Sequence, residues 1–183
     1  MVEAESVLQA ELDATDQLIQ IEPKHYNAWS HRLYIARRFG LLNSDSELDF
    51  TAKFIELDVR NNSAWSYRRY VFADHDVEKE IQFCLSKLRL SPSNESVWVY
   101  LRSLKDWQNH SDVESLCMEY VNGIKLSPKP IDIVHYRDVL DTAVQIFKSR
   151  GEHDSANQFL NLLKQGDHIR ERLHEAKIAS IIY

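Results

Sequence analysis

Glycine and proline are scarce in this chain, with four residues of each among 183. All-β chains need these residues for their many turns, so the scarcity favours an all-α fold. Only two cysteines are present, Cys84 and Cys117, and each lies between apolar residues. We therefore expect buried, reduced thiols of a cytoplasmic protein and no disulfide framework.

Basic residues are outnumbered, with 22 Lys and Arg against 28 Asp and Glu and a formal net charge of -6. Nucleic-acid-binding proteins normally show a clustered basic stripe, which this sequence lacks. No apolar run reaches the roughly 18 to 20 residues of a membrane span. The first 20 residues are acidic and amphipathic, unlike a secretory signal peptide. We expect a cytoplasmic localisation, no nucleic-acid partner and no membrane insertion.

Motifs for metal binding and for several kinds of catalysis are also missing. The eight histidines are scattered, and neither cysteine has a Cys or His at ligand spacing, so the chain itself is predicted to hold no metal. There is no glycine-rich loop that could cradle a phosphate and no serine-nucleophile motif.

Three tryptophans are the most informative residues that the chain does contain. Trp29, Trp65 and Trp98 stand in similar phrases, at spacings of 36 and 33 residues. A period in this range is typical of helical-hairpin repeats, in which each hairpin buries its apolar face by stacking on its neighbours. The three rings are therefore predicted core residues, and the predicted fold is all-α, a right-handed α-α superhelix of about five hairpins.

The hairpins can be placed along the chain from the apolar periodicity and the helix-cap residues. We predict a single solenoid over residues 1–183, with units at 5–39, 44–74, 76–107, a degenerate 110–150 and a C-terminal hairpin at 152–183. Predicted helices are 3–21, 26–39, 45–57, 62–74, 77–90, 95–107, 111–126, 131–149, 153–165 and 167–182. Asn61 or Asn62, and Asn94, are candidate N-caps, Gly40 is a candidate C-cap, and Ser127–Pro130 is a predicted break.

The segment Pro23-Lys24-His25-Tyr26-Asn27-Ala28-Trp29-Ser30-His31-Arg32 resembles the repeat of protein prenyltransferase α subunits. Asp58-Val59-Arg60-Asn61-Asn62-Ser63-Ala64-Trp65 is most similar to the α subunit shared by protein farnesyltransferase and type I geranylgeranyltransferase. The phrase around Trp98 continues the resemblance in the same order, and the similarity covers residues 8–105. Family members are roughly twice as long, so we expect a C-terminal half or a truncated form.

The resemblance implies a heterodimeric enzyme in which this chain is the α subunit or a fragment of it. In that family the chain wraps a β subunit that holds the catalytic zinc, and magnesium is a further candidate cofactor. The complex transfers a farnesyl or geranylgeranyl group from an isoprenoid diphosphate to the cysteine of C-terminal CaaX proteins. The isolated α chain is expected to be inactive, with both cofactors carried by the complex through the β subunit.

The same resemblance indicates which residues would face the shared site. Lys24 and Tyr26 are candidate catalytic residues, and His25, Asn27 and His31 are candidates for the substrate-facing rim. A lysine near a helix N-terminus could meet a diphosphate; the alternative is that Lys24 is a solvated loop charge.

Two arginines follow the tryptophans at the same offset, because Arg32 and Arg68 each come three residues after one. With Trp29, Trp65 and Trp98 they are predicted to form the structural core of the repeats. The expected partners of the arginines are Glu47, Asp49 or a backbone carbonyl of a neighbouring repeat.

A second functional class stays open from the sequence. A tetratricopeptide-like scaffold that binds proteins or peptides without chemistry would also be a helical-hairpin solenoid. The Trp-x-x-Arg phrase favours the prenyltransferase class, because tetratricopeptide repeats carry small residues at the helix crossings.

Overall fold

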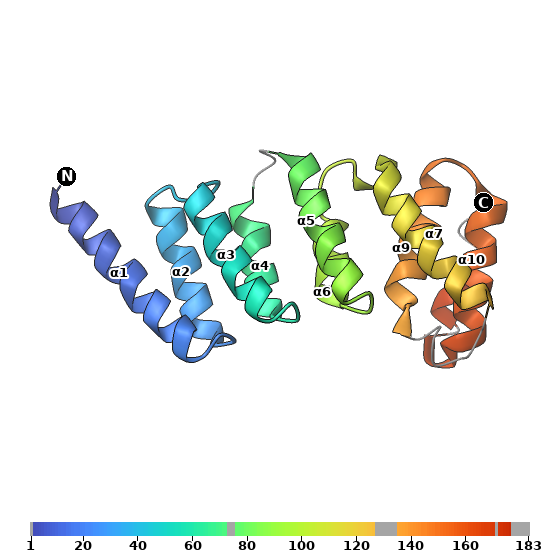
Figure 1. Ribbon diagram of the computed structural model, residues 1–183, viewed down its shortest axis with the longest axis horizontal. Coiled ribbons are helices and arrows are strands. Elements are labelled where there is room, and N and C mark those ends of the chain that lie inside the picture. Colours follow the sequence, from blue (N-terminus) through green and yellow to red (C-terminus); the bar gives the residue numbers. More distant parts are fainter. Residues whose placement is uncertain (1, 73–75, 127–134, 171, 177–183) are drawn as a thin grey trace. The chain divides into compact units, whose positions relative to one another are not determined.

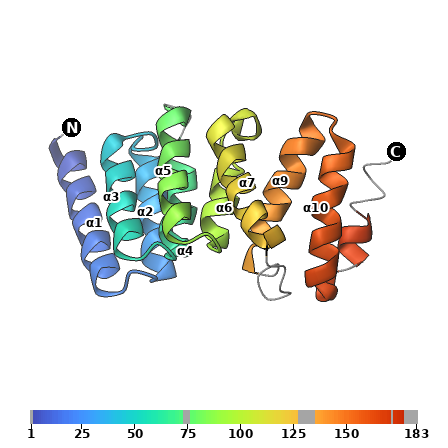
Figure 2. The same ribbon diagram turned by 45° about the vertical axis from the view of Figure 1, so that its right-hand side comes forward.

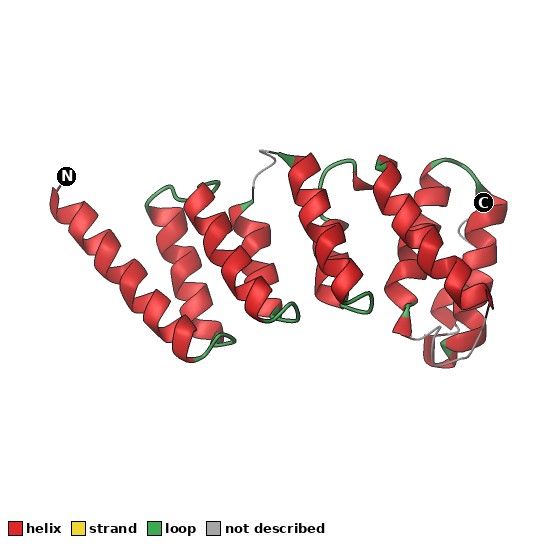
Figure 3. Cartoon of the chain, viewed as in Figure 1, coloured by secondary structure: helices red, strands yellow, loops and turns green. Residues whose placement is uncertain are grey.

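The computed structural model describes residues 2–72, 76–126, 135–170 and 172–176. Every regular element in these ranges is a helix, as Figure 3 shows. Among them, none is both long enough and apolar enough to cross a membrane. The chain falls into two compact units, Met1–Val77 and Glu78–Tyr183.

The first unit consists of two helical hairpins (Figure 1). Helix α1 (Val2–Ile21) packs on α2 (Tyr26–Arg38), and α3 (Asp45–Leu57) packs on α4 (Asn62–Val71). The second helices of the two hairpins, α2 and α4, also lie side by side. This contact joins the hairpins and leaves one flank of α2 and α4 facing outward.

Short polar side chains set where the helices of this unit begin. His25, Ser44 and Asn61 are the N-caps of α2, α3 and α4, and each side chain accepts a hydrogen bond from the backbone N–H three residues later. After α2 the chain turns at Gly40, whose φ of 71° lies in the left-handed region that favours glycine. The N-cap prediction for Asn61 is confirmed, and so is the prediction that Gly40 ends this helix in a left-handed conformation, directly after the C-cap Phe39.

The second unit continues the hairpin pattern (Figure 2). The elements are α5 (Val77–Leu90), α6 (Glu95–Leu101), the 3-10 turn η1 (Trp107–Asn109), α7 (Ser111–Leu126), α9 (Arg137–Ser149), α10 (His153–Gly166) and the 3-10 turn η2 (His168–Arg170). Helix α9 is central, because α7, α6 and α10 all pack against it. Helix α9 thus packs against α6, the second helix of the preceding hairpin, as α4 packs against α2.

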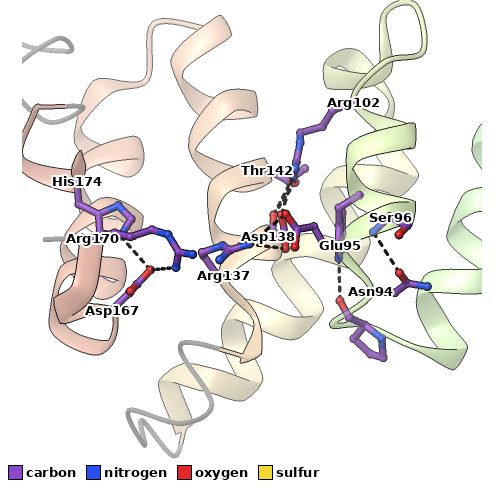
Figure 4. Close-up of polar contacts among 12 residues, drawn as sticks. Asn94, Glu95, Ser96, Arg102, Arg137, Asp138, Thr142, Asp167, Arg170 and His174 are labelled. Atoms are coloured by element: carbon purple, nitrogen blue, oxygen red, sulfur yellow. Dashed lines mark hydrogen bonds and ion pairs between the residues drawn. The ribbon is translucent and has the colours of Figure 1, made fainter. Parts of the chain in front are cut away.

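Polar contacts hold this unit at two places, drawn in Figure 4. Arg102, just after α6, reaches α9, where its guanidinium lies 3.1 Å from Asp138 Oδ1 and 3.0 Å from Thr142 Oγ1. Near the other end, the buried Asp167 carboxylate lies 3.0 Å from Arg170 Nη1 and 3.5 Å from His174 Nε2. Both carboxylates therefore have a cationic partner on a neighbouring segment.

The repeated tryptophans form the core of their hairpins. Trp29, Trp65 and Trp98 are only 4%, 2% and 0% exposed. Each indole Nε1–H donates to the carbonyl oxygen six residues earlier, those of Pro23, Val59 and Pro92, over 2.9, 2.8 and 2.7 Å. The ring thus fills the core while its polar edge holds the loop between the two helices of the hairpin.

The predicted all-α fold of stacked hairpins is confirmed, as are the core positions of the three tryptophans. Four hairpins are described, α1–α2, α3–α4, α5–α6 and α7–α9. The right-handed twist and the single continuous solenoid stay predictions. Cys84 and Cys117 are buried, as expected, and burial raises the pKa of the Cys117 thiol to about 12.

Several predicted boundaries differ from the structure. The predicted helix 62–74 ends at Val71, and 95–107 ends at Leu101. Leu104 and Trp107 are buried and keep the apolar spacing, but the backbone leaves the helix through i→i+3 bonds and a left-handed Asp106 with φ 54°.

At the C-terminal end, the 167–182 prediction corresponds to η2 and a short helical stretch at 172–176. Parts of the predictions lie outside the described residues, namely positions 73–74, the Ser127–Pro130 break, positions 131–134, position 171 and positions 177–183.

Candidate functional site

The predicted site residues cluster where α1 leads into α2. Lys24 lies in this loop, and its Nζ is 2.9 Å from Oδ2 of Asp58, which lies in the corresponding loop of the next hairpin. The lysine side chain is 62% exposed. Its hydrogen bond is the main cause that lowers the pKa of Asp58. Lys24 therefore joins two neighbouring loops and keeps its charge at the surface.

The other four predicted residues have different surroundings. The His25 ring caps α2, with Nδ1 accepting from the Ala28 N–H at 3.2 Å. The Tyr26 ring is 76% exposed, and Asn27 is exposed beside it. His31, one turn further on, is 2.8 Å from Glu11 of α1 and stacks on Tyr34. Of the five predicted residues, only Tyr26 borders the groove described next.

A groove runs between the outward flanks of α2 and α4. It has a volume of about 370 Å³. Aromatic side chains dominate its lining, and hydroxyl and amide groups supply the polar part. The lining residues are Tyr26, Trp29, Ser30, Leu33, Asn62, Ser63, Ser66, Tyr67 and Tyr70. No charged side chain is among them, so the groove suits an uncharged surface of a partner.

The aromatic residues of the groove divide into a buried floor and exposed walls. Trp29 and Tyr67 are almost fully buried, with ring centroids 5.4 Å apart. Tyr26 and Tyr70 stand exposed at the edges, and the Arg37 guanidinium lies 5.2 Å from the centre of the Tyr70 ring. Exposed tyrosines next to a buried aromatic floor are typical of protein interfaces, because a partner can desolvate large rings with little loss of entropy.

A buried ion pair supports this floor from behind. Arg32 of α2 donates from Nε and Nη2 to the two oxygens of Glu47 in α3, over 2.8 and 2.7 Å. The Tyr67 hydroxyl donates to the same carboxylate over 2.5 Å. Although burial opposes the charge, Glu47 raises the pKa of Arg32, and burial together with Glu47 raises the pKa of Tyr67. The expected Arg32–Glu47 pairing is confirmed.

Arg68 contacts the first helix of its own hairpin. Its Nη1 donates to the Leu48 carbonyl over 2.8 Å and to Thr51 Oγ1 over 2.7 Å. The Leu48 carbonyl belongs to the same repeat as Arg68, whereas a carbonyl of a neighbouring repeat was expected. Asp49, the third candidate partner, is exposed on the surface of α3.

Sequence reasoning missed the groove, although a signal for it exists. Ser30 and Ser66, which both line the groove, are 36 residues apart and each directly follows a tryptophan. A search for exposed residues at the tryptophan period would have found them. Asp58 was missed as well, because its partner Lys24 lies 34 positions away and no pattern in the sequence links the two.

Metal ligands are not gathered anywhere in the described part of the chain. Within it, no group of three or more His, Cys, Asp or Glu side chains could hold a metal ion. These residues therefore offer no set of ligands that would suit zinc.

Comparisons with known proteins agree with the repeat pattern. The model of the protein prenyltransferase alpha subunit repeat matches residues 8–39, 44–74 and 77–104. The chain is 27% identical over 154 residues to the protein farnesyltransferase/geranylgeranyltransferase type-1 subunit alpha of Dictyostelium discoideum. This match covers 84% of the chain and 38% of the relative, so the chain spans well under half of that protein.

A solved structure shares the fold. It is the Candida albicans protein geranylgeranyltransferase-I complexed with GGPP, with a TM-score of 0.76 and 24% identity. The match covers 94% of this chain and 59% of the other. At this identity the likeness shows the arrangement of helices, and it places the hairpins described above in a known fold.

Proposed function

The chain belongs to the protein prenyltransferase alpha subunit repeat family, and on this premise we propose that it is the α subunit, or part of one, of a heterodimeric protein prenyltransferase. The enzyme would transfer a farnesyl or geranylgeranyl group from its diphosphate to the cysteine of C-terminal CaaX proteins. The observation that carries the proposal is the set of three family repeats, in which all three tryptophans are buried together with Arg32 and Arg68 of the first two.

The role proposed for this chain is to present a surface to a zinc-bearing β subunit. The tyrosine-lined groove on α2 and α4 supports this role, because it is uncharged and its exposed rings have no cover within the described residues. The described residues also lack a zinc ligand set, so zinc would be held by the partner, and any magnesium with it. There zinc would make the substrate thiol nucleophilic.

Lys24 and Tyr26 are the residues through which the chain could act on the substrate. Lys24 lies in the loop just before α2, and Tyr26, the first residue of α2, borders the groove. The Lys24 ammonium could exchange its exposed Asp58 partner for an oxygen of a departing diphosphate. We infer that the chain works in the cytoplasm, where CaaX proteins would meet the complex.

The proposal can be tested by co-expression with a β subunit of a type I geranylgeranyltransferase or a farnesyltransferase. We expect the two chains to co-purify, and the complex to transfer labelled prenyl groups to a CaaX peptide. The chain alone and the β subunit alone are the controls, and the chain alone should hold no stoichiometric zinc. Failure to co-purify with either β subunit would contradict the proposal, and assembly without transfer would favour a scaffold role.

A further inference from the structure

The two helices that flank the groove carry arginines and no acidic residue. Helix α2 contains three arginines and helix α4 contains two, and neither helix contains an Asp, a Glu or a Lys. The chain as a whole has a formal net charge of -6, and helix α1 of the same unit contains five Asp and Glu residues with no Lys or Arg. Positive charge is thus concentrated beside the groove.

Arg37 and Arg69 lie at one end of this groove. Arg37 comes four positions after Leu33, which lines the groove on α2. Arg69 comes three positions after Ser66, which lines it on α4. Spacings of three and four residues place each arginine on the groove side of its helix. Because the Arg37 guanidinium also lies 5.2 Å from the centre of the Tyr70 ring, a partner segment that follows the groove beyond Tyr70 would pass both arginines.

The exposed guanidiniums have no acidic partner in the described part of the chain. Arg37, Arg38 and Arg69 are exposed, and none of them forms an ion pair within those residues. Arg32 and Arg68 of the same two helices differ, because both are buried and hydrogen-bonded to α3. The exposed arginines are therefore available to an anionic group of a partner.

The helix dipoles offset only part of this charge. A helix C-terminus carries roughly half a negative charge, whereas the last turn of α2 has two exposed arginines. The same C-terminus exposes backbone carbonyl oxygens, which repel a doubly charged phosphate more strongly than a carboxylate. An Asp or Glu side chain is thus the anion that fits best, and a guanidinium can bind it through two parallel hydrogen bonds.

We propose that a segment of the β subunit docks along this groove, with apolar residues between α2 and α4 and with Asp or Glu side chains on Arg37 and Arg69. The inference rests on the proposed function and adds the chemistry of the partner segment. The uncharged groove with its exposed tyrosines and the arginines that continue it support this arrangement. The apolar part would supply affinity, and the arginines would orient the segment and speed its association.

Association kinetics with a β subunit of a type I geranylgeranyltransferase test the role of charge. Arg37→Glu and Arg69→Glu should each slow association by at least about threefold at about 0.05 M salt, and the difference from the parent should shrink at about 0.5 M salt. Lys53→Glu is the matched control, because it makes the same change of charge on an exposed side chain of α3 that does not line the groove. Melting temperatures show whether each variant still folds.

A cross-link without a spacer identifies the partner group. In a complex of the Arg37→Lys chain, a carbodiimide should join the introduced amine to a nearby carboxylate. Peptide mapping should then find an Asp or Glu of the β subunit attached at position 37. Tyr34→Lys provides the control, because Tyr34 is exposed on the same helix outside the groove and should form no such link.

The outcomes separate this inference from the proposed function. A parent chain that does not bind the β subunit would overturn both. The inference alone is overturned if the parent binds while the Arg37 and Arg69 variants behave like Lys53→Glu, or if no link forms at position 37. It is also overturned if inorganic phosphate at constant ionic strength slows association of the parent but not of Arg37→Glu, since the arginines would then form a phosphate site.

Discussion

The Arg32 guanidinium and the Glu47 carboxylate form a two-pronged ion pair between successive hairpins, with both side chains almost fully buried. Trp29, on the same side of α2 as Arg32, packs against the α3 helix that supplies Glu47. One helix thus contributes an apolar ring and a cation to its neighbour, and the groove residue Tyr67 is held by the same carboxylate. Stability and the shape of the candidate site are therefore linked.

Glu47→Ala should strongly destabilise the chain. The change leaves the Arg32 charge buried without its main partner, which typically costs about 3–5 kcal/mol. For a chain of this size we expect the melting temperature to fall by about 6 °C or more. Lys24→Ala is the matched control, because it breaks an exposed pair worth at most about 1 kcal/mol. Similar melting temperatures for the two variants would show that the buried pair adds no stability.

Trp65→Ala is expected to be the most damaging single truncation. The ring is 2% exposed and its Nε1–H holds the Val59 carbonyl, so the change removes core volume and also frees a loop. Loss of a buried Trp typically costs about 3–5 kcal/mol. Thermal unfolding followed by circular dichroism measures the effect, and Tyr70→Ala serves as an exposed aromatic control. A shift within about 2 °C of the parent would contradict the prediction.

The sequence predicted the hairpins well because burial recurs at a fixed period. Trp29, Trp65 and their arginines repeat, and each repeat must fill the same space in the stack. The end of α6 at Leu101 was not predictable in this way, since Leu104 and Trp107 keep the apolar spacing while the backbone turns.

The candidate site was predicted only in part. Tyr26 lies in the family's repeat phrase and borders the groove, but Tyr70 lies outside that phrase. The Lys24–Asp58 pair depends on how two loops approach each other, and this distance is set by the packing of whole hairpins. Local sequence patterns therefore do not predict the distance between the two loops.

Tyr67 should make the chain less stable at alkaline pH than near neutral pH. Burial and the Glu47 charge raise the pKa of Tyr67 above the usual value of about 10. Above pH 10 the unfolded chain therefore loses this proton while the folded chain keeps it, so the free energy of unfolding falls as the pH rises. The contribution is fully present below pH 10.

Tyr67→Phe isolates this effect. We expect the parent to be more stable than Tyr67→Phe near neutral pH, and the difference to shrink by about 1.4 kcal/mol per unit above pH 10. Urea unfolding at several pH values between 8 and about 11 gives the difference directly. A constant difference over this range would show that Tyr67 ionises equally well in both states.

The groove should be an energetic centre of partner binding. Tyr26→Ala and Tyr70→Ala each remove an exposed ring from its edge, and central tyrosines of interfaces often contribute about 2 kcal/mol or more. We expect each change to weaken the affinity for a β subunit by at least about tenfold with little change in melting temperature. Tyr34→Ala is the control, because Tyr34 is exposed on α2 but does not line the groove. Equal losses of β-subunit affinity for all three variants would show that the groove contributes no more to binding than another exposed tyrosine.

Lys24→Ala should affect turnover and not assembly. The lysine is 62% exposed and its only described partner is the half-exposed Asp58, so its removal should change neither the fold nor the groove. Lys24 lies two residues before Tyr26, the first residue of α2, and donors near a helix N-terminus suit an oxygen of a departing diphosphate. Stabilising charge as it develops is typically worth a few kcal/mol in a closed site.

The measurement compares steady-state turnover and β-subunit affinity of the parent and Lys24→Ala complexes, with Asp58→Asn as the matched control. Asp58→Asn removes the competing carboxylate but keeps the lysine, so its turnover should equal or exceed that of the parent. For Lys24→Ala we expect turnover to fall clearly more than about twofold at unchanged affinity. A smaller loss would leave Lys24 as a surface charge that joins two loops, and the contribution of this chain to the enzyme would then be structural.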